Sequence, residues 1–331
     1  MANSRKSNSI EVVTRDVEHL LKRCVSRNQR VAIAFSGGLD SSVLLHCAVA
    51  ICEKIGIVLT TIHVHHRLSS NADLWAAHCE QQAGQFGVDH TTIHVNVDHD
   101  CADGLEASAR QERYAAFTTL NVDWIMLAHH LDDQAETVMH NLLRGSGVRG
   151  MAGMLPVRSK FLRPLLATTR QQLHDYAVHF GLTWCEDESN DDLRFTRNYI
   201  RNTVMPMLKL RHPAASTQIA AAAQRFAEAQ ELLDDLARID AGAAPHSFPF
   251  PVATLVALNP HRACNLLRYL LALANQQSPI QARLTEFVRQ VREAGPDRHP
   301  QLDFGGCRLR VKHRQILMEP RSDMQEPKSR I

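Results

Sequence analysis

The sequence predicts an α/β fold with a doubly wound parallel sheet, followed by a long linker helix and a small α+β domain. Two observations lead to this prediction. Over roughly the first 200 residues, short apolar runs alternate with amphipathic stretches, and successive runs lie about 25 residues apart, which leaves room for a crossover helix. From Pro213 the composition changes to a stretch rich in Ala, Gln and Leu, and then to a shorter mixed region.

The elements of the first part follow from residue type and period. Apolar runs rich in β-branched residues predict buried strands, and apolar residues repeating at helical spacing predict the helices between them. Glycines lie at or near the ends of several helices, where a left-handed cap is typical. Strands are predicted at 31–35, 57–65, 91–97 and 124–128, and helices at 42–56, 73–86, 107–120, 133–144 and 169–180.

The second part begins with a stretch that contains neither Gly nor Pro over 214–241, which predicts one long helix. The segment AGAAPHSFPFPV at 241–252 then resembles a linker. Beyond it we expect helices near 261–274 and 279–294 and a hairpin over 301–320. The predicted domains are a catalytic domain at 1–213, a linker helix at 214–243, a small basic domain at 244–320 and a disordered tail at 321–331.

Composition excludes several classes of protein. Of the 331 residues, 44% are apolar and 22% are charged, which is typical of a soluble globular protein. No apolar run reaches the roughly 18 residues that a membrane-spanning helix needs, and the N-terminus lacks a signal peptide's apolar core. The eight cysteines form no C-x-x-C pair. We therefore expect a reduced, cytoplasmic protein without a disulfide framework or zinc site.

The first candidate site is SGGLDSS at 36–42, in the corner between a predicted strand and helix. Two adjacent glycines allow close backbone approach, and the first N–H groups of the following helix would point at the same place. These groups suit a phosphate. Asp40 does not, unless a divalent cation lies between its carboxylate and the phosphate oxygens. A purely structural strand–turn–helix remains the alternative.

The second candidate site is HHLDDQAET at 129–137, where a strand ends and a helix begins. Ligands of open α/β sheets bind at the carboxyl ends of strands. Asp133 and Glu136 are three residues apart, so they share a helix face and could hold Mg²⁺ together. Alternatively, Asp132 or Asp133 caps the helix with Glu136 as its capping-box partner. The histidines have no third ligand at a suitable spacing, which disfavours zinc.

Three basic segments are candidates for contacts with phosphate or nucleic acid. A glycine-rich loop follows the predicted helix 133–144, a helical stripe has basic residues three and four apart, and a strand alternates cations with apolar residues. Plain connectors and solvated faces are the alternatives. Between residues 244 and 320 the sequence has ten Arg or Lys against five Asp or Glu. The residues are Arg144 and Arg149 in the loop, Arg194, Arg197 and Arg201 on the helix, and Arg308, Arg310 and Lys312 on the strand.

Two motifs resemble known families. SGGLDSS is similar to the pyrophosphate loop, or PP-loop, of the N-type ATP pyrophosphatases, whose fold is the adenine-nucleotide alpha-hydrolase type. The run HHLDDQAETVMHNLLRGSGVRGMAGM at 129–154 resembles the signature of the tRNA(Ile)-lysidine synthetase family. Further segments agree in order: HVHHRL at 63–68, Glu106-x-x-x-Arg110-x-x-x-Tyr114, RPLL at 163–166 and EDESNDDLRFTRNYIRNTVMP at 186–206.

The resemblance implies a reaction and its substrates. ATP would adenylate the C2 oxygen of the wobble cytidine in the isoleucine tRNA with a CAU anticodon, and L-lysine would then displace AMP to form lysidine. Mg²⁺ is implied, held by Asp40 with Asp133 or Glu136. Arg110 and Arg201 would offset phosphate charge, and His129 and Asp133 would position lysine or transfer its proton. The residues expected to cradle the phosphates are Ser36, Gly37, Gly38, Leu39, Asp40 and Ser41.

Rival functions on the same fold are less consistent with the residues. A tRNA cytidine thiolase relies on paired cysteines, an amidotransferase-type relative needs a glutaminase, and a non-catalytic ATP-binding module does not need so many arginines. Longer relatives continue into a further C-terminal domain, before which we expect this sequence to end. The oligomeric state stays open, with a homodimer as one option.

Overall fold

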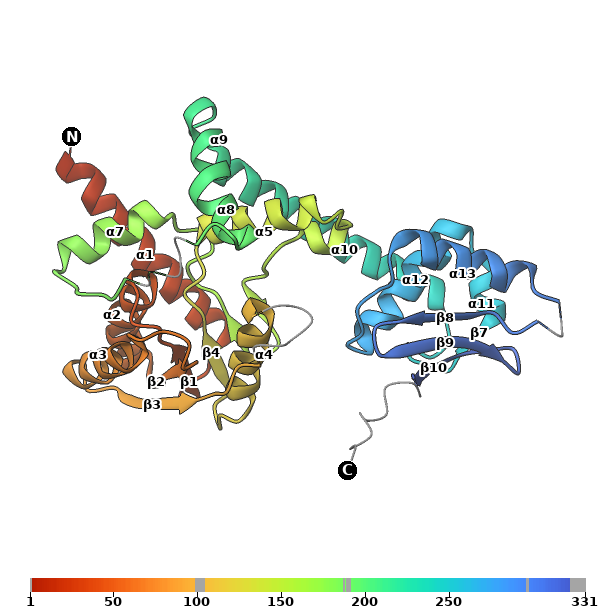
Figure 1. Ribbon diagram of the computed structural model, residues 1–331, viewed down its shortest axis with the longest axis horizontal. Helices are drawn as coiled ribbons and strands as arrows, with labels where there is room; N and C mark the ends of the chain where they lie inside the picture. The colour runs from red at the N-terminus through yellow and green to blue at the C-terminus, as the bar shows by residue number, and fades with distance from the viewer. Residues whose placement is uncertain (1, 99–104, 187, 189–191, 296–297, 322–331) are drawn as a thin grey trace. The chain divides into compact units, whose positions relative to one another are not determined.

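The computed structural model describes residues 2–98, 105–186, 188, 192–295 and 298–321. The chain divides into two compact units, Met1–Ala227 and Glu228–Ile331, each with its own hydrophobic core. The boundary lies inside one long helix, α10 (Ala215–Ala241), which confirms the helix predicted over 214–241 (Figure 1).

A six-stranded sheet forms the centre of the first unit, in the order β3-β2-β1-β4-β6-β5. All pairs are parallel except β5 with β6. The four predicted strands are confirmed to within three residues at either end. The β5–β6 hairpin was not predicted, because strands of two residues are too short to show a period. The strands are β1 (Arg30–Ala34), β2 (Val58–His65), β3 (Asp89–His94), β4 (Trp124–Met126), β5 (Val157–Arg158) and β6 (Phe161–Leu162).

Helices lie between these strands at the predicted places, and the helix predicted for the basic stripe is present over 196–204. The sequence pattern missed the helices at 2–24, 148–151 and 205–211. The helices of this unit are α1 (Ala2–Cys24), α2 (Leu39–Ile55), α3 (Ala72–Gln85), α4 (Leu105–Thr118), α5 (Leu131–Leu143), α6 (Val148–Met151), α7 (Arg170–His179), α8 (Thr196–Tyr199), η2 (Ile200–Val204) and α9 (Met205–Arg211).

Both faces of the sheet are covered by helices, as the doubly wound prediction requires. Successive side chains of a strand point to opposite faces. Val31 and Ile33 of β1 pack in the core that contains residues of α1, α2 and α7, whereas Ala32 packs in the core that contains Phe117 of α4. Burial on both faces explains why the central strands β1 and β4 are mostly apolar runs rather than alternating ones.

The element η2 is a π-helical turn between α8 and α9. Pro206, just inside α9, has no backbone N–H, and in a regular α-helix its ring would crowd the carbonyl group of Asn202 four residues earlier. A wider turn relieves this crowding, and π turns are frequent at functional sites. Arg201 lies in this turn.

The second unit has an antiparallel four-stranded sheet in the order β7-β10-β9-β8. The α+β prediction is confirmed, with two corrections. The segment 241–252 is not only a linker, because its end forms β7, and the expected hairpin has three strands. Residues 322–331 of the predicted tail lie outside the described residues. The elements are β7 (Phe250–Pro251), α11 (Val252–Ala257), α12 (Pro260–Leu273), α13 (Gln281–Glu293), β8 (Gln301–Phe304), β9 (Cys307–Lys312) and β10 (Gln315–Pro320).

Two expected absences can be examined over the described ranges. No helix there is long and apolar enough to cross a membrane. The described cysteines are free thiols, and no cluster of His, Cys, Asp or Glu in the described parts of the chain has the arrangement of a metal site. Cys101, within the undescribed segment 99–104, is outside this comparison.

Candidate active site

The strand order places the two predicted motifs side by side. The sheet order reverses between β1 and β4, and doubly wound sheets bind ligands beyond the carboxyl ends of the strands at such a switch point. The segment SGGLDSS follows β1, and the HHLDD segment follows β4. The two motifs meet where His130 Nε2 lies 3.6 Å from Asp40 Oδ2.

The glycine corner leaves its backbone donors available. Gly37 has a φ of +77°, a left-handed conformation that glycine adopts without strain, and Gly38 is the N-cap of α2. No side chain caps this helix, because its N-cap residue is a glycine. The Ser41 hydroxyl donates back to the Gly38 carbonyl at 3.0 Å and lies 3.0 Å from the Ser36 hydroxyl. The first N–H groups of α2 therefore remain for an anion.

We expect Gly37→Ala to lower the affinity for ATP by about ten-fold or more. Alanine would have to be held in the left-handed conformation of the phosphate-binding corner, which costs about 1–2 kcal/mol of the binding free energy. The added methyl group would also lie 3.0 Å from the Cys79 sulfur and 3.3 Å from the His78 ring. Calorimetric titration with ATP measures the effect. Gly84→Ala is the matched control, since a methyl group there meets nothing within 4 Å. Equal affinities in both variants would contradict a phosphate-binding corner.

Asp40 has the properties of a metal ligand. Its Oδ1 is buried and has no hydrogen-bond partner among the described residues, although buried polar atoms usually have one. Burial raises the pKa of Asp40, while the neighbouring His130 lowers it. A hard cation bridging to phosphate oxygens would satisfy this oxygen. The residue type and the orphaned atom therefore fit the Mg²⁺ that the sequence predicts.

Asp133 and Glu136 lie on one face of α5, as predicted, but both are bound by arginine. Arg201 donates to Glu136 Oε1 and Oε2 at 2.9 and 2.8 Å and to Asp133 Oδ1 at 2.8 Å. Arg197 lies 3.5 Å from Asp133 and 3.6 Å from Glu136. The two guanidinium groups neutralise the two carboxylates. The geometry therefore does not support this pair as a Mg²⁺ site.

His130 supplies the N-cap of α5, which corrects the predicted cap. The Asp133 N–H donates to His130 Nδ1 at 3.3 Å, and the His130 N–H donates to Asp133 Oδ2 at 3.1 Å. The capping-box partner is thus Asp133 rather than Glu136, and the helix begins at Leu131. Burial alone would raise the pKa of Asp133, but His130, Arg197 and Arg201 together hold this pKa below its usual value.

Asp132, the other acid of the pair, connects α5 to three other segments. Its carboxylate accepts hydrogen bonds from Lys209 of α9 at 2.7 Å, from the Ser216 hydroxyl of α10 at 2.8 Å and from the Arg170 N–H of α7 at 3.0 Å. Burial opposes ionisation, but these donors lower the pKa of Asp132 to about 2. This role has no signal in the sequence, because all three partners lie far away along the chain.

The low pKa of Asp132 predicts a pH-dependent stability. The stabilising effect is complete above the ordinary pKa of 3.8 and is lost as the pH falls through about 2. We expect Asp132→Asn to lower the free energy of unfolding at neutral pH by about 2 kcal/mol and to weaken the pH dependence between these two values. Urea unfolding followed by tryptophan fluorescence measures this, since Trp75, Trp124 and Trp184 all lie in the first unit. The exposed Asp89→Asn variant is the control. The same pH profile in both variants would contradict the prediction.

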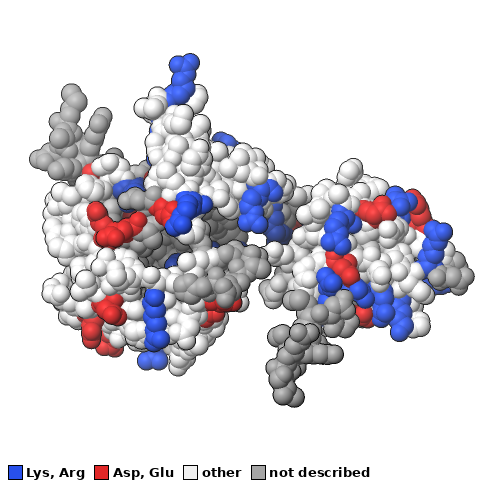
Figure 2. Space-filling model, in the orientation of Figure 1, with Lys and Arg blue, Asp and Glu red and all other residues white. Residues whose placement is uncertain are grey.

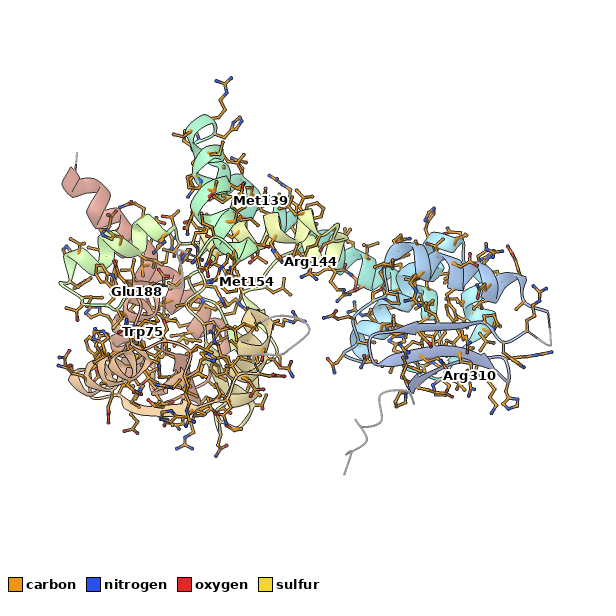
Figure 3. The ribbon with its side chains drawn as sticks, in the orientation of Figure 1. Trp75, Met139, Arg144, Met154, Glu188 and Arg310 are labelled. Atoms are coloured by element: carbon orange, nitrogen blue, oxygen red, sulfur yellow. The ribbon has the colours of Figure 1, made fainter. Side chains whose placement is uncertain are left out.

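The glycine-rich segment after α5 is anchored by two amide side chains. Buried Gln134 donates to Met154 O at 3.0 Å and accepts from Met154 N at 2.8 Å, and Asn141 donates to Gly150 O at 2.7 Å. Figure 3 marks Arg144 at the end of α5 and Met154 at the end of this segment. Both arginines of the segment, Arg144 and Arg149, are exposed. The segment contains the short helix α6 and is therefore more than an open connector.

Of the three arginines predicted to share one face of a helix, Arg194 lies outside the helix. Arg194 precedes α8, is 88% exposed and pairs with Asp192 at 2.7 Å. Arg197 and Arg201 do share one side, which faces the carboxylates of α5. Their contact with tRNA stays a prediction.

His129 and Arg110 lie beside this cluster. Burial lowers the pKa of His129 to about 3. The Asp133 carboxylate opposes this shift, whereas the nearby arginines 163, 197 and 110 increase it. Its Nδ1 is buried without a hydrogen-bond partner among the described residues. Arg110 is exposed and lies 5.1 Å above the ring of Tyr114. His129 is therefore a neutral ring next to positively charged neighbours.

In the second unit, the strand β9 alternates as predicted, with Leu309 buried and the cations on the other face. The cations are not all free, because Arg308 pairs with Asp303 of β8 and Arg310 with Glu319 of β10. Figure 2 shows basic and acidic side chains interspersed on the drawn face of this unit. Only exposed Lys312 has no acidic partner on the neighbouring described strands.

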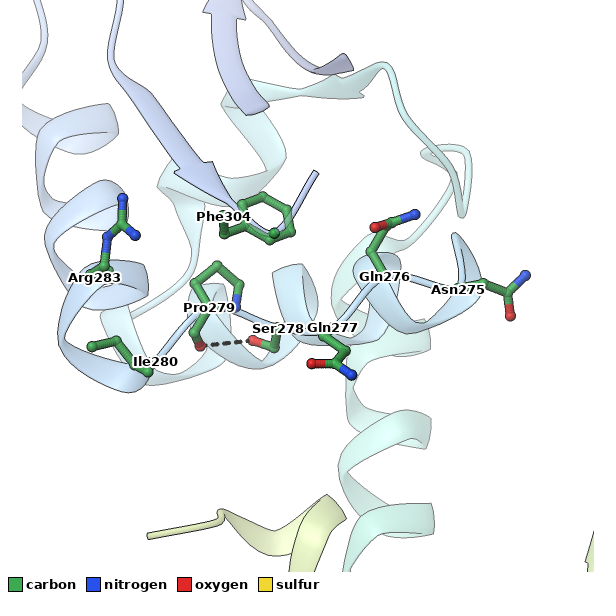
Figure 4. Close-up of a pocket in the computed structure, with 9 residues that line it drawn as sticks. Asn275, Gln276, Gln277, Ser278, Pro279, Ile280, Arg283 and Phe304 are labelled. Carbon is green, nitrogen blue, oxygen red and sulfur yellow. Dashed lines mark hydrogen bonds between the residues drawn. The ribbon is translucent and has the colours of Figure 1, made fainter. Parts of the chain in front are cut away.

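A shallow pocket of about 440 Å³ lies elsewhere on this unit (Figure 4). The loop 275–280 lines it together with Arg283, Phe304 and Gly305. None of the predicted site residues lines the pocket, and it is not part of the site at the switch point.

Comparison with known proteins agrees with this architecture. Residues 10–208 match the PP-loop domain family, so the class defined by the fold and the glycine corner is a PP-loop protein. Residues 250–317 match the TilS substrate binding domain family. The chain belongs to the tRNA(Ile)-lysidine synthase family.

Its relatives match over most of this chain. A tRNA(Ile)-lysidine synthase of Alkalilimnicola ehrlichii is 43% identical over 284 residues, which are 84% of this chain and 64% of the relative. One of Aromatoleum aromaticum is 40% identical over 291 residues, which are 87% of this chain and 69% of the relative. The chain thus spans about two thirds of the length of these relatives.

A solved structure is similar in fold alone. The U34-tRNA thiolase of Methanococcus maripaludis with its [4Fe-4S] cluster aligns with a TM-score of 0.54 at 19% identity, over 67% of this chain and 80% of that chain.

Proposed function

We propose that the chain is a ligase that attaches L-lysine to C2 of the wobble cytidine of the isoleucine tRNA with a CAU anticodon. ATP adenylates the C2 oxygen and releases pyrophosphate. The amine of lysine then attacks C2 and displaces AMP, which leaves lysidine. The family of the chain supports this activity, and so does the meeting of the glycine corner with the acidic end of α5, where Asp40 and His130 lie 3.6 Å apart.

The glycine corner supports the nucleotide part of this proposal. The hydroxyl groups of Ser36 and Ser41 contact each other and Gly38, and the backbone N–H groups at the start of α2 have no side-chain cap and can bind an anion. Asp40 would hold Mg²⁺ through its orphaned Oδ1. When bound, Mg²⁺ neutralises the charge that develops on the departing pyrophosphate.

The acidic end of α5 supports the lysine part. Asp133 is ionised because its pKa lies below the usual value. Arg197 and Arg201 contact its Oδ1, whereas its Oδ2 lies next to His130 and can accept a hydrogen bond from the lysine amine. An efficient general base has a pKa near the working pH, whereas the pKa of His129 is about 3. We therefore propose that Asp133 and His129 position the amine of lysine, rather than that either of them accepts its proton.

Access to tRNA rests on exposed arginines. The wobble base is single-stranded, so turning it into a site costs a few kcal/mol at most. Arg144 and Arg149 are exposed at the segment after α5, and Arg194 is exposed before α8. In the second unit Lys312 is the exposed cation of β9, while Arg308 and Arg310 are bound to carboxylates. We propose these side chains as contacts to tRNA phosphates.

One assay tests the function directly. The purified chain is incubated with ATP, labelled lysine and a transcript of the isoleucine tRNA with a CAU anticodon. We expect label in this transcript, together with AMP and pyrophosphate, and none in a matched transcript with a GAU anticodon. ATP binding without turnover would indicate a binding module, and AMP release without lysine incorporation would indicate another nucleophile.

A further inference from the structure

Arg163 is a buried arginine that the roles above leave without a function. It follows directly after β6, and only 6% of the residue is exposed. Its Nη1 donates to the Leu155 carbonyl at 2.9 Å, and its backbone N–H donates to the Pro156 carbonyl at 2.8 Å. Its Nε is buried and has no hydrogen-bond partner among the described residues.

The charge of Arg163 is also uncompensated. Among the described residues no Asp or Glu acts on its charge; its neighbours are the Tyr114 hydroxyl and the cations Arg110 and Arg158. Burial lowers the pKa of Arg163, the Tyr114 hydroxyl opposes the shift, and the two arginines add to it. A buried guanidinium is costly unless it is paired.

The buried carboxylates at the start of α5, in contrast, are compensated. Asp132 is bound by Lys209, and Asp133 and Glu136 are bound by Arg201. Arg163 therefore departs from the pattern of its surroundings. A buried donor and a buried charge without partners together indicate a ligand that the described residues do not include.

The neighbours of Arg163 indicate the chemistry of that ligand. Arg110 has its guanidinium 5.1 Å from the centre of the Tyr114 ring and donates to the Tyr114 hydroxyl at 3.5 Å. His129 lies close enough for both arginines to act on its charge state, and its Nδ1 has no partner among the described side chains and backbone groups. Two arginines, a phenol and an imidazole with free donor capacity form a set suited to an oxyanion.

We propose that Arg163 and Arg110, with Tyr114 and His129 beside them, bind a phosphate oxyanion of the substrates. This inference rests on the proposed function, which supplies two sources of that group. One source is the phosphodiester next to the wobble nucleotide, and the other is the α-phosphate of ATP. Both present oxygens that arginine binds in a bidentate manner.

The experiment compares Arg163→Gln with wild type in two binding assays on the full 331-residue chain. ATP affinity is measured by calorimetry without tRNA, and affinity for the CAU-anticodon transcript is measured by filter binding over a salt series. We expect Arg163→Gln to lower one of the two affinities by about ten-fold or more. If the phosphate belongs to tRNA, ATP affinity stays unchanged and the slope of log K against log salt falls by about 0.7–0.9. If it belongs to ATP, only ATP affinity falls.

Arg158→Gln is the matched control, because Arg158 lies in the same hairpin, carries the same charge and is exposed. We expect it to leave both affinities unchanged. The inference is overturned if Arg163→Gln binds both ligands as wild type does, or if Arg158→Gln has an equal effect.

A second variant and a parallel wild-type measurement distinguish loss of the phosphate site from loss of folding or of the proposed function. Should Arg163→Gln fail to fold, Arg110→Gln removes an exposed member of the same group and is expected to weaken the same ligand. Wild type is measured in parallel. If wild type binds neither ATP nor the transcript, the proposed function fails, whereas normal wild-type binding with an unaffected variant refutes only the phosphate site.

Discussion

Replacing Asp40 by Asn is expected to lower the rate of pyrophosphate release by about a hundred-fold or more, which corresponds to the loss of one strong electrostatic contact in the transition state. The side chain keeps its size and loses only its charge. Oδ1 of Asp40 is buried without a partner among the described residues, and its Oδ2 is 3.6 Å from His130. An amide in that place would bind a divalent cation poorly. Malachite-green detection of phosphate, after pyrophosphatase treatment, measures the rate.

The control for Asp40→Asn is Asp89→Asn, which makes the same chemical change at an exposed residue of β3. Tryptophan fluorescence and circular dichroism establish that both variants keep the fold. Normal pyrophosphate release by folded Asp40→Asn would refute the assignment of the glycine corner as the phosphate site.

Replacing Arg201 by Met is expected to destabilise the first unit by about 3–5 kcal/mol, because it leaves buried carboxylates without their partner. Arg201 makes three hydrogen bonds of 2.8–2.9 Å to Asp133 and Glu136. The Glu136 side chain is only 5% exposed, so water cannot replace the guanidinium. Urea unfolding followed by tryptophan fluorescence measures the change in the free energy of unfolding.

A double variant separates charge from packing. In Arg201→Met with Glu136→Gln, one unpaired buried charge is removed, so we expect the two effects to be non-additive and part of the stability to return. Arg211→Met, an exposed arginine in α9, should change stability by no more than about 0.5 kcal/mol. A loss below about 1 kcal/mol for Arg201→Met would mean that the carboxylates do not depend on this arginine.

The fold could be predicted where the local pattern of apolar residues agrees with the secondary structure that the folded protein adopts. The period of apolar residues located the four longer strands and the helices between them, because each of these elements buries at least one side against the core. The β5–β6 hairpin and the π turn had no such signal. Two-residue strands show no period, and the only local mark of the π turn is Pro206.

The sequence indicated candidate site residues but not the ion pairs that join them. The spacing of Asp133 and Glu136 correctly placed them on one face, yet the sequence could not indicate that Arg201 binds both, since the pairing joins residues 65 positions apart. The sequence does not indicate that His130 caps α5, because capping by a histidine ring has no common sequence signature. Arg163 could have been found from RPLL, as an arginine directly after a buried strand.

The acid–arginine cluster also bears on how the chain is made. Asp133 and Glu136 leave the ribosome well before Arg197 and Arg201, which follow more than 60 residues later. Until those arginines emerge, the start of α5 holds two carboxylates that cannot both enter the interior in charged form. The nascent protein can thus build its central sheet early, but it completes these ion pairs only near the end of the first unit's synthesis.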